Sequence, residues 1–297
     1  MKHIRSLFDL TKQEIIDIID KSIDIKKNLK KYYAALANKT LILLFEKPST
    51  RTRVSFEVGI AQLGGNSIYL DWNTTQLKKA ALKDEIRCIA RYADLIAARV
   101  FKQETIDEMA KYSSKPVINA LSDKHHPCQI IADLMTIKEK KGKLKGLKLA
   151  YIGDGNNVCN SLIIGCTMAG MNIAVATPKG YEPLKEAVKF AGNNLQLTTD
   201  PKIAAKDADI IYTDAWVSMG QEEEKEQRLK DFKGYQINKY LLGKALFMHC
   251  LPAYRNVEVT DEVMDCKQSI IFDQAENRMH SQKAIMVELL STLSTRT

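Results

Sequence analysis

The 297-residue sequence lacks the long apolar segments of exported and membrane-spanning chains. Its first residues, Met1 to Asp9, contain no apolar stretch of signal-peptide length, so we expect no export signal. The longest stretch without charge, residues 155–178, is long enough to cross a bilayer. Asparagines and glycines interrupt it, however, so it predicts a buried helix followed by a buried strand. We therefore expect a cytoplasmic protein without a membrane partner.

Cysteine is present, but it lacks the spacing of a metal site. The six cysteines include no Cys-x-x-Cys pair and no Cys/His pattern typical of zinc. Without an export signal they are expected to be reduced thiols, and most of them to be small core residues. The cysteines therefore show no pattern of a zinc site.

The chain is basic, with a net charge of +8, but it lacks the features of a nucleic-acid-binding protein. Its lysines are dispersed in segments such as 26–31 and 138–143, and aromatic residues are not interleaved with them. These segments are typical of solvated helix faces, so we expect no nucleic-acid partner. A mildly positive field would still speed the encounter with an anionic substrate.

Predicted strands and helices alternate along the chain, which indicates an α/β fold. A chain of this length suits two domains of roughly 150 residues. The alternation predicts a mostly parallel sheet covered by helices in each half, with a surface turn between the halves at 140–146. The expected strands are 41–45, 67–70, 95–101, 117–120, 147–152, 173–178, 210–212, 245–248 and 269–273; the main expected helices lie within 9–36, 54–63, 85–92, 129–141, 182–191 and 283–293.

Residues 45–53, Phe-Glu-Lys-Pro-Ser-Thr-Arg-Thr-Arg, place hydroxyl and guanidinium groups where a buried strand turns into a helix. The free N–H groups at a helix start favour negative charge, and an arginine fork can hold two phosphate oxygens at once. An ordinary helix cap formed by Ser49, followed by solvated arginines, is the structural alternative. Because five consecutive polar donors follow the strand, the stretch predicts a phosphate-binding pocket.

Further polar residues follow other predicted strands in both halves. They are residues 99, 126–129, 157, 214–219, 249–252 and 278. Ligand crevices of open α/β sheets lie at the carboxyl ends of the strands, so the pattern predicts one cleft between the two halves. We interpret His125, beside His126, as solvent-facing.

The turn after strand 147–152 resembles the start of a dinucleotide-binding fingerprint. It reads Gly153-Asp154-Gly155-Asn156-Asn157-Val158, in which Val158 occupies the place of the third glycine. No acidic residue ends the next predicted strand. The segment therefore indicates a tight strand-to-helix turn rather than a nicotinamide site.

Four of these motifs together resemble the aspartate/ornithine carbamoyltransferase family. They are Ser49–Arg53, His126-Pro127-x-Gln129, Asp214-x-x-x-Ser218-Met219-Gly220 and His249-Cys250-Leu251-Pro252. The first two also occur in aspartate-specific members, and the last two resemble the ornithine-specific ones. The resemblance covers essentially the whole chain. It implies a carbamoyl-phosphate-binding domain, 1–135 completed by helix 275–297, an ornithine-binding domain, 136–274, and an active site in the cleft between them.

The implied reaction transfers a carbamoyl group from carbamoyl phosphate to the side-chain amine of L-ornithine and gives L-citrulline and phosphate. Arg99 and His126 would donate to the carbamoyl oxygen, where negative charge develops. By the family pattern Cys250, coupled to Asp214, sits where it could assist. We assign it no role as a base, because a thiolate would stabilise the cationic amine rather than its reactive neutral form. The residues implied for carbamoyl phosphate are Ser49, Thr50, Arg51, Thr52, Gln76, Arg99, His126, Gln129, Cys250, Leu251 and Arg278, and those implied for ornithine are Asn157, Asp214, Ser218 and Met219.

The resemblance also implies an assembly, a homotrimer or a multiple of trimers, with a loop in which Gln76 reaches the site of a neighbouring subunit. It implies no cofactor and no metal. The chain departs from the family pattern directly after Gln76, where it reads Lys78-Lys79-Ala80. It leaves open whether the enzyme serves arginine synthesis or citrulline breakdown.

Three other functions compete with this prediction. A carbamoyltransferase could use another amine acceptor, such as putrescine or an acylated ornithine. The 218–220 segment opposes this, since putrescine has no amino-acid head group to be recognised. A non-catalytic ligand-binding relative is the second alternative, and a nicotinamide-dependent oxidoreductase is the third.

Overall fold

The computed structural model describes residues 2–217, 220 and 222–294. The chain divides into two compact units. Unit 1 holds the described residues up to Met135 together with those from Glu276 onward, and unit 2 is Thr136–Ala275. Unit 1 is therefore built from both ends of the chain, whereas unit 2 is one continuous segment.

Unit 1 contains a four-stranded sheet in the order β2-β1-β3-β4, and every neighbouring pair is parallel. Leu41 to Phe45 of β1 are buried on both faces, as expected for a strand covered by helices on either side. The strands are β1 (Thr40–Phe45), β2 (Asn66–Asp71), β3 (Leu95–Arg99) and β4 (Val117–Leu121); the helices are α1 (Lys12–Lys27), α2 (Thr50–Ala61), α3 (Leu82–Ile89), α4 (Gln103–Tyr112) and the starting part of α5 (Pro127–Lys141), with short 3₁₀ turns η1 (Leu7–Asp9), η2 (Leu29–Tyr32), η3 (Trp72–Thr74) and η4 (Gln76–Lys78).

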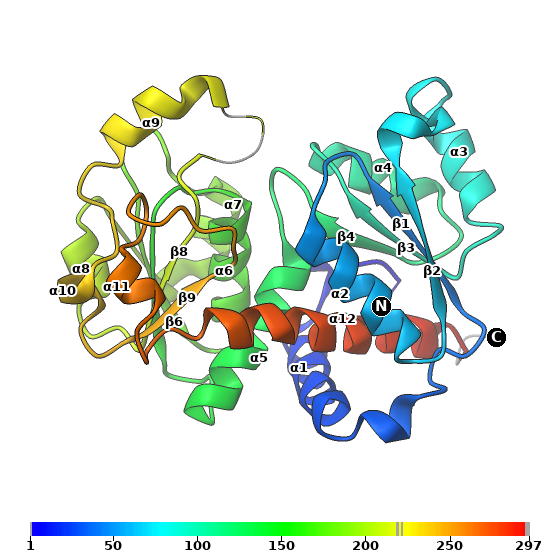
Figure 1. The fold of residues 1–297 in the computed structure, drawn as a ribbon, viewed down its shortest axis with the longest axis horizontal. Coiled ribbons are helices and arrows are strands. Elements are labelled where there is room, and N and C mark those ends of the chain that lie inside the picture. Colours follow the sequence, from blue (N-terminus) through cyan, green and yellow to red (C-terminus); the bar gives the residue numbers. More distant parts are fainter. Residues whose placement is uncertain (1, 218–219, 221, 295–297) are drawn as a thin grey trace. The chain divides into compact units, whose positions relative to one another are not determined.

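Unit 2 contains a five-stranded parallel sheet in the order β7-β6-β5-β8-β9. Its strands are β5 (Lys148–Ile152), β6 (Asn172–Ala176), β7 (Leu195–Thr198), β8 (Ile210–Thr213) and β9 (Leu246–His249); its helices are α6 (Asn157–Met168), α7 (Lys185–Ala191), α8 (Pro201–Ala205), α9 (Lys225–Asp231), α10 (Lys239–Leu242) and α11 (Asp261–Met264), with 3₁₀ turns η5 (Gly192–Asn194) and η6 (Glu222–Glu224). In both units helices flank the sheet (Figure 1). The predicted α/β class with two mostly parallel sheets is confirmed.

The last predicted strand is wrong. Only Ser269 pairs with Phe247, as an isolated bridge, and Ile271 already begins α12 (Ile271–Ser294). The run Ile270-Ile271-Phe272 is too short for its periodicity to separate a buried strand from a buried helix. The terminal helix therefore begins twelve residues before the predicted start at residue 283.

Helix α12 completes unit 1 by packing along α2 (Figure 1). Gly59 of α2 allows this approach, since a Cβ built there would lie 3.6 Å from the Met279 carbonyl oxygen. Lys283 is fully buried and donates to Gln62 Oε1, and Arg278 donates to Thr52. Two hydrogen bonds thus join the helix that returns from the far end of the chain to the helix that follows β1.

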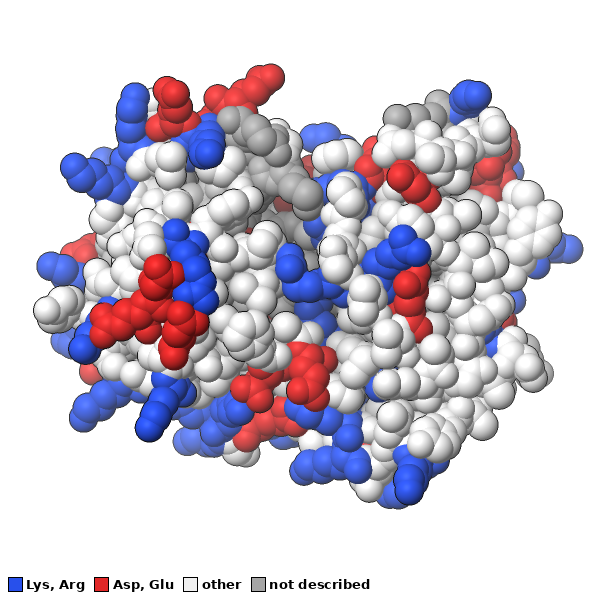
Figure 2. Space-filling model, in the orientation of Figure 1, with Lys and Arg blue, Asp and Glu red and all other residues white. Residues whose placement is uncertain are grey.

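The described surface carries both signs of charge. On the face that Figure 2 shows, Lys and Arg side chains are scattered among Asp and Glu side chains. Among the described helices, not one is both long and apolar enough to span a membrane.

Candidate active site

In unit 1 the first site element is the start of α2, directly after β1. Ser49 is the N-cap, and its Oγ accepts from the Thr52 backbone N–H at 3.3 Å. Thr52 is fully buried, and its hydroxyl oxygen accepts from Arg278 Nη2 at 2.9 Å. Arg51 lies half-buried in the same first turn, and Thr50 is exposed there. The helix start thus gathers hydroxyl, guanidinium and backbone N–H donors, the groups that bind an oxyanion.

His126 is the second site element, and cations surround it. It is 4% exposed and directly precedes α5. Burial lowers its pKa well below the ordinary value of 6.5, and the charges of Arg278, Arg99 and Lys47 lower this pKa further. The imidazole is therefore neutral around pH 7, so one of its nitrogens donates without adding a fixed charge.

Arg99 and Arg278 come from distant parts of the chain. Arg99 ends β3 and is 6% exposed, and Arg278 on α12 is 3% exposed. Two nearly buried guanidinium groups close to one neutral imidazole create a positive field in a water-poor region, where an anion is bound more strongly than at the surface.

Lys47 belongs to the same cluster, and sequence reasoning missed it as a site residue. Burial lowers the pKa of Lys47 to about 8, with a further contribution from the charge of Arg99. Its ammonium lies 5.0 Å from the ring centroid of Phe101. The only sequence signal was its place within the Phe45–Arg53 stretch.

Gln129 offers an acceptor to this cluster. It is fully buried on α5, and its Nε2 donates to Asp133 at 2.8 Å. Among the described residues no donor reaches its Oε1. A buried amide oxygen without a donor is costly, and a ligand N–H would satisfy it.

Gln76 is a further predicted site residue of unit 1. Gln76 is exposed at the start of η4, where its carbonyl oxygen accepts from Lys79 and Ala80. The described contacts do not bring it to the His126 cluster.

His125 is 4% exposed and packs edge to face on Phe8, with ring centroids 6.2 Å apart. The prediction of a solvent-facing His125 is therefore wrong, because this aromatic contact draws the ring inward.

In unit 2 the site elements gather around the Asp214 carboxylate, just after β8. Its Oδ1 accepts from the Cys250 thiol at 3.1 Å and from the Ala215 backbone N–H at 2.8 Å. Its Oδ2 accepts from Asn156 Nδ2 at 2.8 Å. The thiol is the donor in this contact.

The loop after β9 carries Cys250 and Leu251. His249 is fully buried; its Nδ1 accepts from the Leu251 N–H at 2.9 Å, and its Nε2 contacts the buried Glu258 at 3.2 Å. Leu251 has a φ of 61°, and the following Leu251–Pro252 bond is cis. His249 and Glu258 thus hold the loop that contains residues 250 and 251.

Asp214, His249 and Cys250 are the described residues that come closest to a metal-ligand set. One ligand atom of each lies within 4.8 Å of the others. Both ring nitrogens of His249 already have hydrogen-bond partners, and the thiol donates to the carboxylate. We therefore assign the group as a hydrogen-bonded network rather than as a metal centre.

The remaining ornithine residues lie in two segments. Asn157 is the first residue of α6, beside the Asp214 network. Ser218 and Met219 lie outside the described residues. The segment before them is held in place by Trp216, which is 5% exposed and stacks on Phe232 with the ring centroids 5.5 Å apart.

Arg228 of α9 links the segment around Trp216 to the turn after β5. It donates to Asp154 Oδ2 at 2.8 Å and to the Trp216 carbonyl oxygen at 3.0 Å. Its side chain is 7% exposed. Sequence reasoning missed Arg228 because a single arginine within a charged segment gives no signal of burial.

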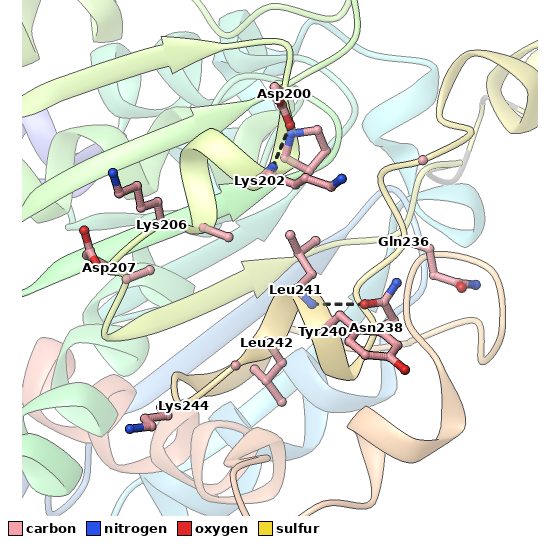
Figure 3. A pocket seen from close by; sticks show the side chains of 15 residues that line it. Asp200, Lys202, Lys206, Asp207, Gln236, Asn238, Tyr240, Leu241, Leu242 and Lys244 are labelled. Carbon is pink, nitrogen blue, oxygen red and sulfur yellow. Dashed lines mark hydrogen bonds between the residues drawn. The ribbon is translucent and has the colours of Figure 1, made fainter.

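A cavity of about 720 Å³ lies elsewhere in unit 2 (Figure 3). It is lined by α8 and α10, and its rim carries Lys202, Lys206 and Lys244. Two of its polar side chains have partners within the protein: Asn238 caps α10, and Gln236 donates to the carbonyl oxygens of residues 256 and 257. None of the predicted site residues lines it.

Comparisons with known proteins cover both units. A family model described as aspartate/ornithine carbamoyltransferase, carbamoyl-P binding domain, matches residues 2–139. A second, described as aspartate/ornithine carbamoyltransferase, Asp/Orn binding domain, matches residues 145–289.

Individual relatives are similar over nearly their whole length. The ornithine carbamoyltransferase of Caldicellulosiruptor saccharolyticus is 55% identical over 301 residues, which cover 97% of this chain and 98% of the relative. That of Methanocaldococcus jannaschii is 51% identical over 296 residues, which cover 95% of this chain and 97% of the relative. The solved structure of the ornithine carbamoyltransferase from Pyrococcus furiosus superposes with a TM-score of 0.93 at 47% identity, covering 98% of this chain and 97% of that one.

Proposed function

This chain belongs to the aspartate/ornithine carbamoyltransferase family, and we propose that it transfers the carbamoyl group of carbamoyl phosphate to L-ornithine. The ornithine side-chain nitrogen attacks the carbonyl carbon and forms the new C–N bond. The C–O bond to phosphate breaks, the phosphate leaves with the electron pair, and the attacking amine loses a proton. The products are L-citrulline and phosphate.

The observation that carries the proposal is the buried cationic cluster of unit 1. A neutral His126 lies in the field of Arg99, Arg278 and Lys47. Carbamoyl phosphate has a dianionic leaving group and a carbonyl oxygen that gains negative charge during attack. Fixed donors and cations aimed at that charge lower the barrier without reorganising. We propose that the donors at the start of α2 hold the phosphate, and that Arg99 and His126 donate to the carbonyl oxygen.

The carbamoyl NH₂ group needs acceptors rather than donors. Gln129 Oε1 is a buried acceptor without a donor among the described residues. The carbonyl groups of Cys250 and Leu251, in the loop held by His249, are further proposed acceptors. This division between donors and acceptors distinguishes the two ends of a carbamoyl group.

We propose that unit 2 binds ornithine through Asn157, Asp214 and the 218–219 segment. The attacking amine must be neutral, although a free alkyl amine has a pKa of about 10.4. The Asp214 carboxylate already accepts three protein hydrogen bonds. It can bind the ammonium head group of ornithine while the side-chain amine remains available for attack.

We also propose a homotrimer that works in the cytoplasm, where thiols such as Cys250 remain reduced. Unit 1 exposes apolar side chains on α2 and on the edge strand β2, namely Val54, Val58 and Ile68. Such side chains favour burial against another copy of the chain. The proposed role of Gln76 at a neighbouring site depends on this assembly.

An acceptor assay tests the proposed function. Citrulline formation is measured with L-ornithine, and carbamoylated product is measured with putrescine and with N-acetylornithine in its place. We expect kcat/KM for ornithine to exceed that for either alternative by about a hundredfold or more, because a site built to pair with an amino-acid head group rejects ligands that lack it. Equal or better turnover of putrescine or acetylornithine would refute the assignment. Binding of both substrates without any product would indicate a non-catalytic relative.

A further inference from the structure

Asn156 is the N-cap of α6 and also contacts the Asp214 carboxylate. Its Oδ1 accepts from the Val158 N–H at 2.9 Å and from the Cys159 N–H at 3.1 Å. Its Nδ2 donates to Asp214 Oδ2 at 2.8 Å. One end of the amide therefore closes a helix, while the other end holds the carboxylate that the proposed function assigns to ornithine.

The orientation of this amide is fixed from several sides. Tyr151 of β5 is fully buried, and its hydroxyl donates to Asn156 Oδ1 at 3.4 Å. The backbone is held by Gly155, whose N–H donates to the Tyr181 carbonyl oxygen at 2.9 Å. A Cβ on Gly155 would lie 2.4 Å from that oxygen, so only glycine fits there. Because these donors face Oδ1, the NH₂ group must face Asp214.

Asp214 has different donors on its two oxygens. Asn156 supplies the donor to Oδ2, whereas Ala215 and Cys250 supply donors to Oδ1. Without the amide, Oδ2 would lose the donor that lies at the start of α6, and the carboxylate could rotate away from Cys250. Among the described residues, titratable groups around this carboxylate are Tyr151 of β5, Asp154 in the following turn, and His249 and Cys250 at the end of β9.

We infer that Asn156 is a positioning residue for ornithine: it orients Asp214 toward Cys250 and the amino-acid head group while it touches neither substrate. The neighbouring Asn157, predicted from the sequence to bind ornithine, has a separate role. This inference rests on the proposed function, and it adds a residue on which ornithine recognition depends but carbamoyl phosphate binding does not.

Asn156→Ser separates positioning from capping. Serine is as good an N-cap as asparagine, but it is too short to reach Asp214 and adds no charge. We expect kcat/KM for ornithine to fall roughly tenfold or more, as for loss of a hydrogen bond to a charged group, with KM for carbamoyl phosphate within about twofold of wild type. Asn238→Ser is the matched control, because Asn238 caps α10 through a 3.0 Å bond from the Leu241 N–H and contacts no proposed site residue among those described. It should keep wild-type kinetics.

Asn156→Asp supplies a second readout. Aspartate also caps helices well, but at pH 8 it places a second carboxylate against Asp214. The like charge favours protonation of the carboxyl group introduced at position 156 as the pH falls, and in this form the group donates to Asp214 as the amide does. The ratio of variant to wild-type kcat/KM for ornithine should therefore rise from pH 8 to pH 6. A residue that acts only as a helix cap would give no such trend.

Several outcomes overturn the inference. The inference is wrong if kcat/KM for ornithine stays within twofold of wild type in both variants at every pH. It is also wrong if KM for carbamoyl phosphate rises as much as kcat/KM for ornithine falls while the circular dichroism spectrum is unchanged. If wild type fails to form citrulline, the proposed function fails, and the inference is judged from Cys250 instead. The rate of its alkylation by iodoacetamide at pH 8, measured by peptide mass spectrometry, should increase in Asn156→Ser because the thiol loses its oriented carboxylate acceptor. An unchanged rate would refute the inference.

Discussion

Arg51 and Arg53 are two residues apart on α2, but their surroundings differ. Arg53 is exposed; its Nε donates to Glu57 at 2.9 Å, and its guanidinium stacks over the Tyr69 ring at 3.9 Å. Arg51 is half-buried in the first turn, next to the N-cap Ser49. The structure thus offers a matched pair of arginines, one beside the predicted phosphate pocket and one engaged on the surface.

The first prediction uses this pair. Arg51→Ala should weaken carbamoyl phosphate binding by about a hundredfold or more in titration calorimetry, because a bidentate charge-assisted contact to phosphate is lost. Arg53→Ala should change the affinity by less than about threefold, since its charge is engaged at the surface. Equal losses in the two variants would mean that overall charge, rather than a contact from Arg51, governs binding.

The second prediction concerns Lys47, whose pKa is lowered to about 8 by burial and by Arg99. Its positive charge is present below pH 8 and is lost as the pH rises through that value. In wild type, kcat/KM for carbamoyl phosphate should therefore fall between pH 7 and pH 9, since this parameter reports groups of the free enzyme.

Two substitutions of Lys47 test this explanation. In Lys47→Met, kcat/KM for carbamoyl phosphate should be roughly tenfold lower than in wild type at pH 7, and its fall around pH 8 should be absent. Lys47→Arg keeps its charge throughout the range, so this fall should be absent there too. A profile in Lys47→Met that still falls around pH 8 would assign the titration to another group.

Sequence reasoning succeeded at the residue scale where residue type and position after a strand were sufficient, as for Arg99 and His126. Arg278 was predicted from the family resemblance, since the strand expected before it is the start of α12. All three side chains lie in one charged cluster, and their roles stay predictions. Lys47 and Asn156 were missed because their importance depends on neighbours that no spacing reveals. The burial of His125 was missed for the same reason, since its partner Phe8 is more than a hundred residues away in the sequence.

At the scale of elements, the pairing of α2 with α12 contains an unusual residue. Lys283 is fully buried, and the neutral Gln62 is its hydrogen-bond partner. Burial lowers its pKa to about 8 from an ordinary value of 10.5. The folded state therefore holds this proton less tightly than the unfolded state does, and the charged lysine lowers the stability of the fold.

The third prediction follows from that sign. Lys283→Met should raise the free energy of unfolding at pH 7 by about 1 kcal/mol or more, because each pKa unit corresponds to about 1.4 kcal/mol. The gain should be complete below pH 8 and shrink as the pH rises from about 8 toward 10.5, where wild type sheds its buried charge. Lys12→Met, at an exposed position on α1, should stay within about 0.5 kcal/mol of wild type in the same denaturant titrations. Destabilisation by Lys283→Met at pH 7 would show that the bond to Gln62 outweighs the buried charge.

Most of the sheet could be predicted because buried parallel strands read as short apolar runs. The predicted strands 41–45, 147–152 and 210–212 lie within two residues of β1, β5 and β8 at each end. Edge strand β7 was missed, since Gln196 and Leu197 alternate without a buried face and both are exposed. Helix α4 also went unrecognised, and the apolar run before Phe272 was assigned to a strand although it starts α12.

At the scale of the whole molecule, both units expose apolar side chains that assembly could cover. Val54 is 49% exposed on α2, and Leu197 is 46% exposed on β7 of unit 2. The proposed trimer would cover the first of these side chains, because Gln76 of the same unit is predicted to reach a neighbouring site.

The fourth prediction tests this difference. Val54→Glu should shift the mass measured by light scattering toward the monomer and make activity fall on dilution, because a charge would be buried at the interface. Leu197→Glu should leave the mass and the activity unchanged. Wild-type chains that are monomeric and fully active at nanomolar concentration would contradict the trimer itself.

The division of unit 1 between the two ends of the chain has a consequence for synthesis on the ribosome. Unit 2 is continuous and ends at Ala275, so all its residues emerge before α12 is complete. The amino-terminal unit begins first but has to wait for residues from Glu276 onward, among them Arg278. A chain that stopped at Ala275 would carry every other proposed binding residue, yet it would lack this guanidinium. The order of translation therefore withholds Arg278, which we propose as a ligand of carbamoyl phosphate, until the polypeptide is nearly finished.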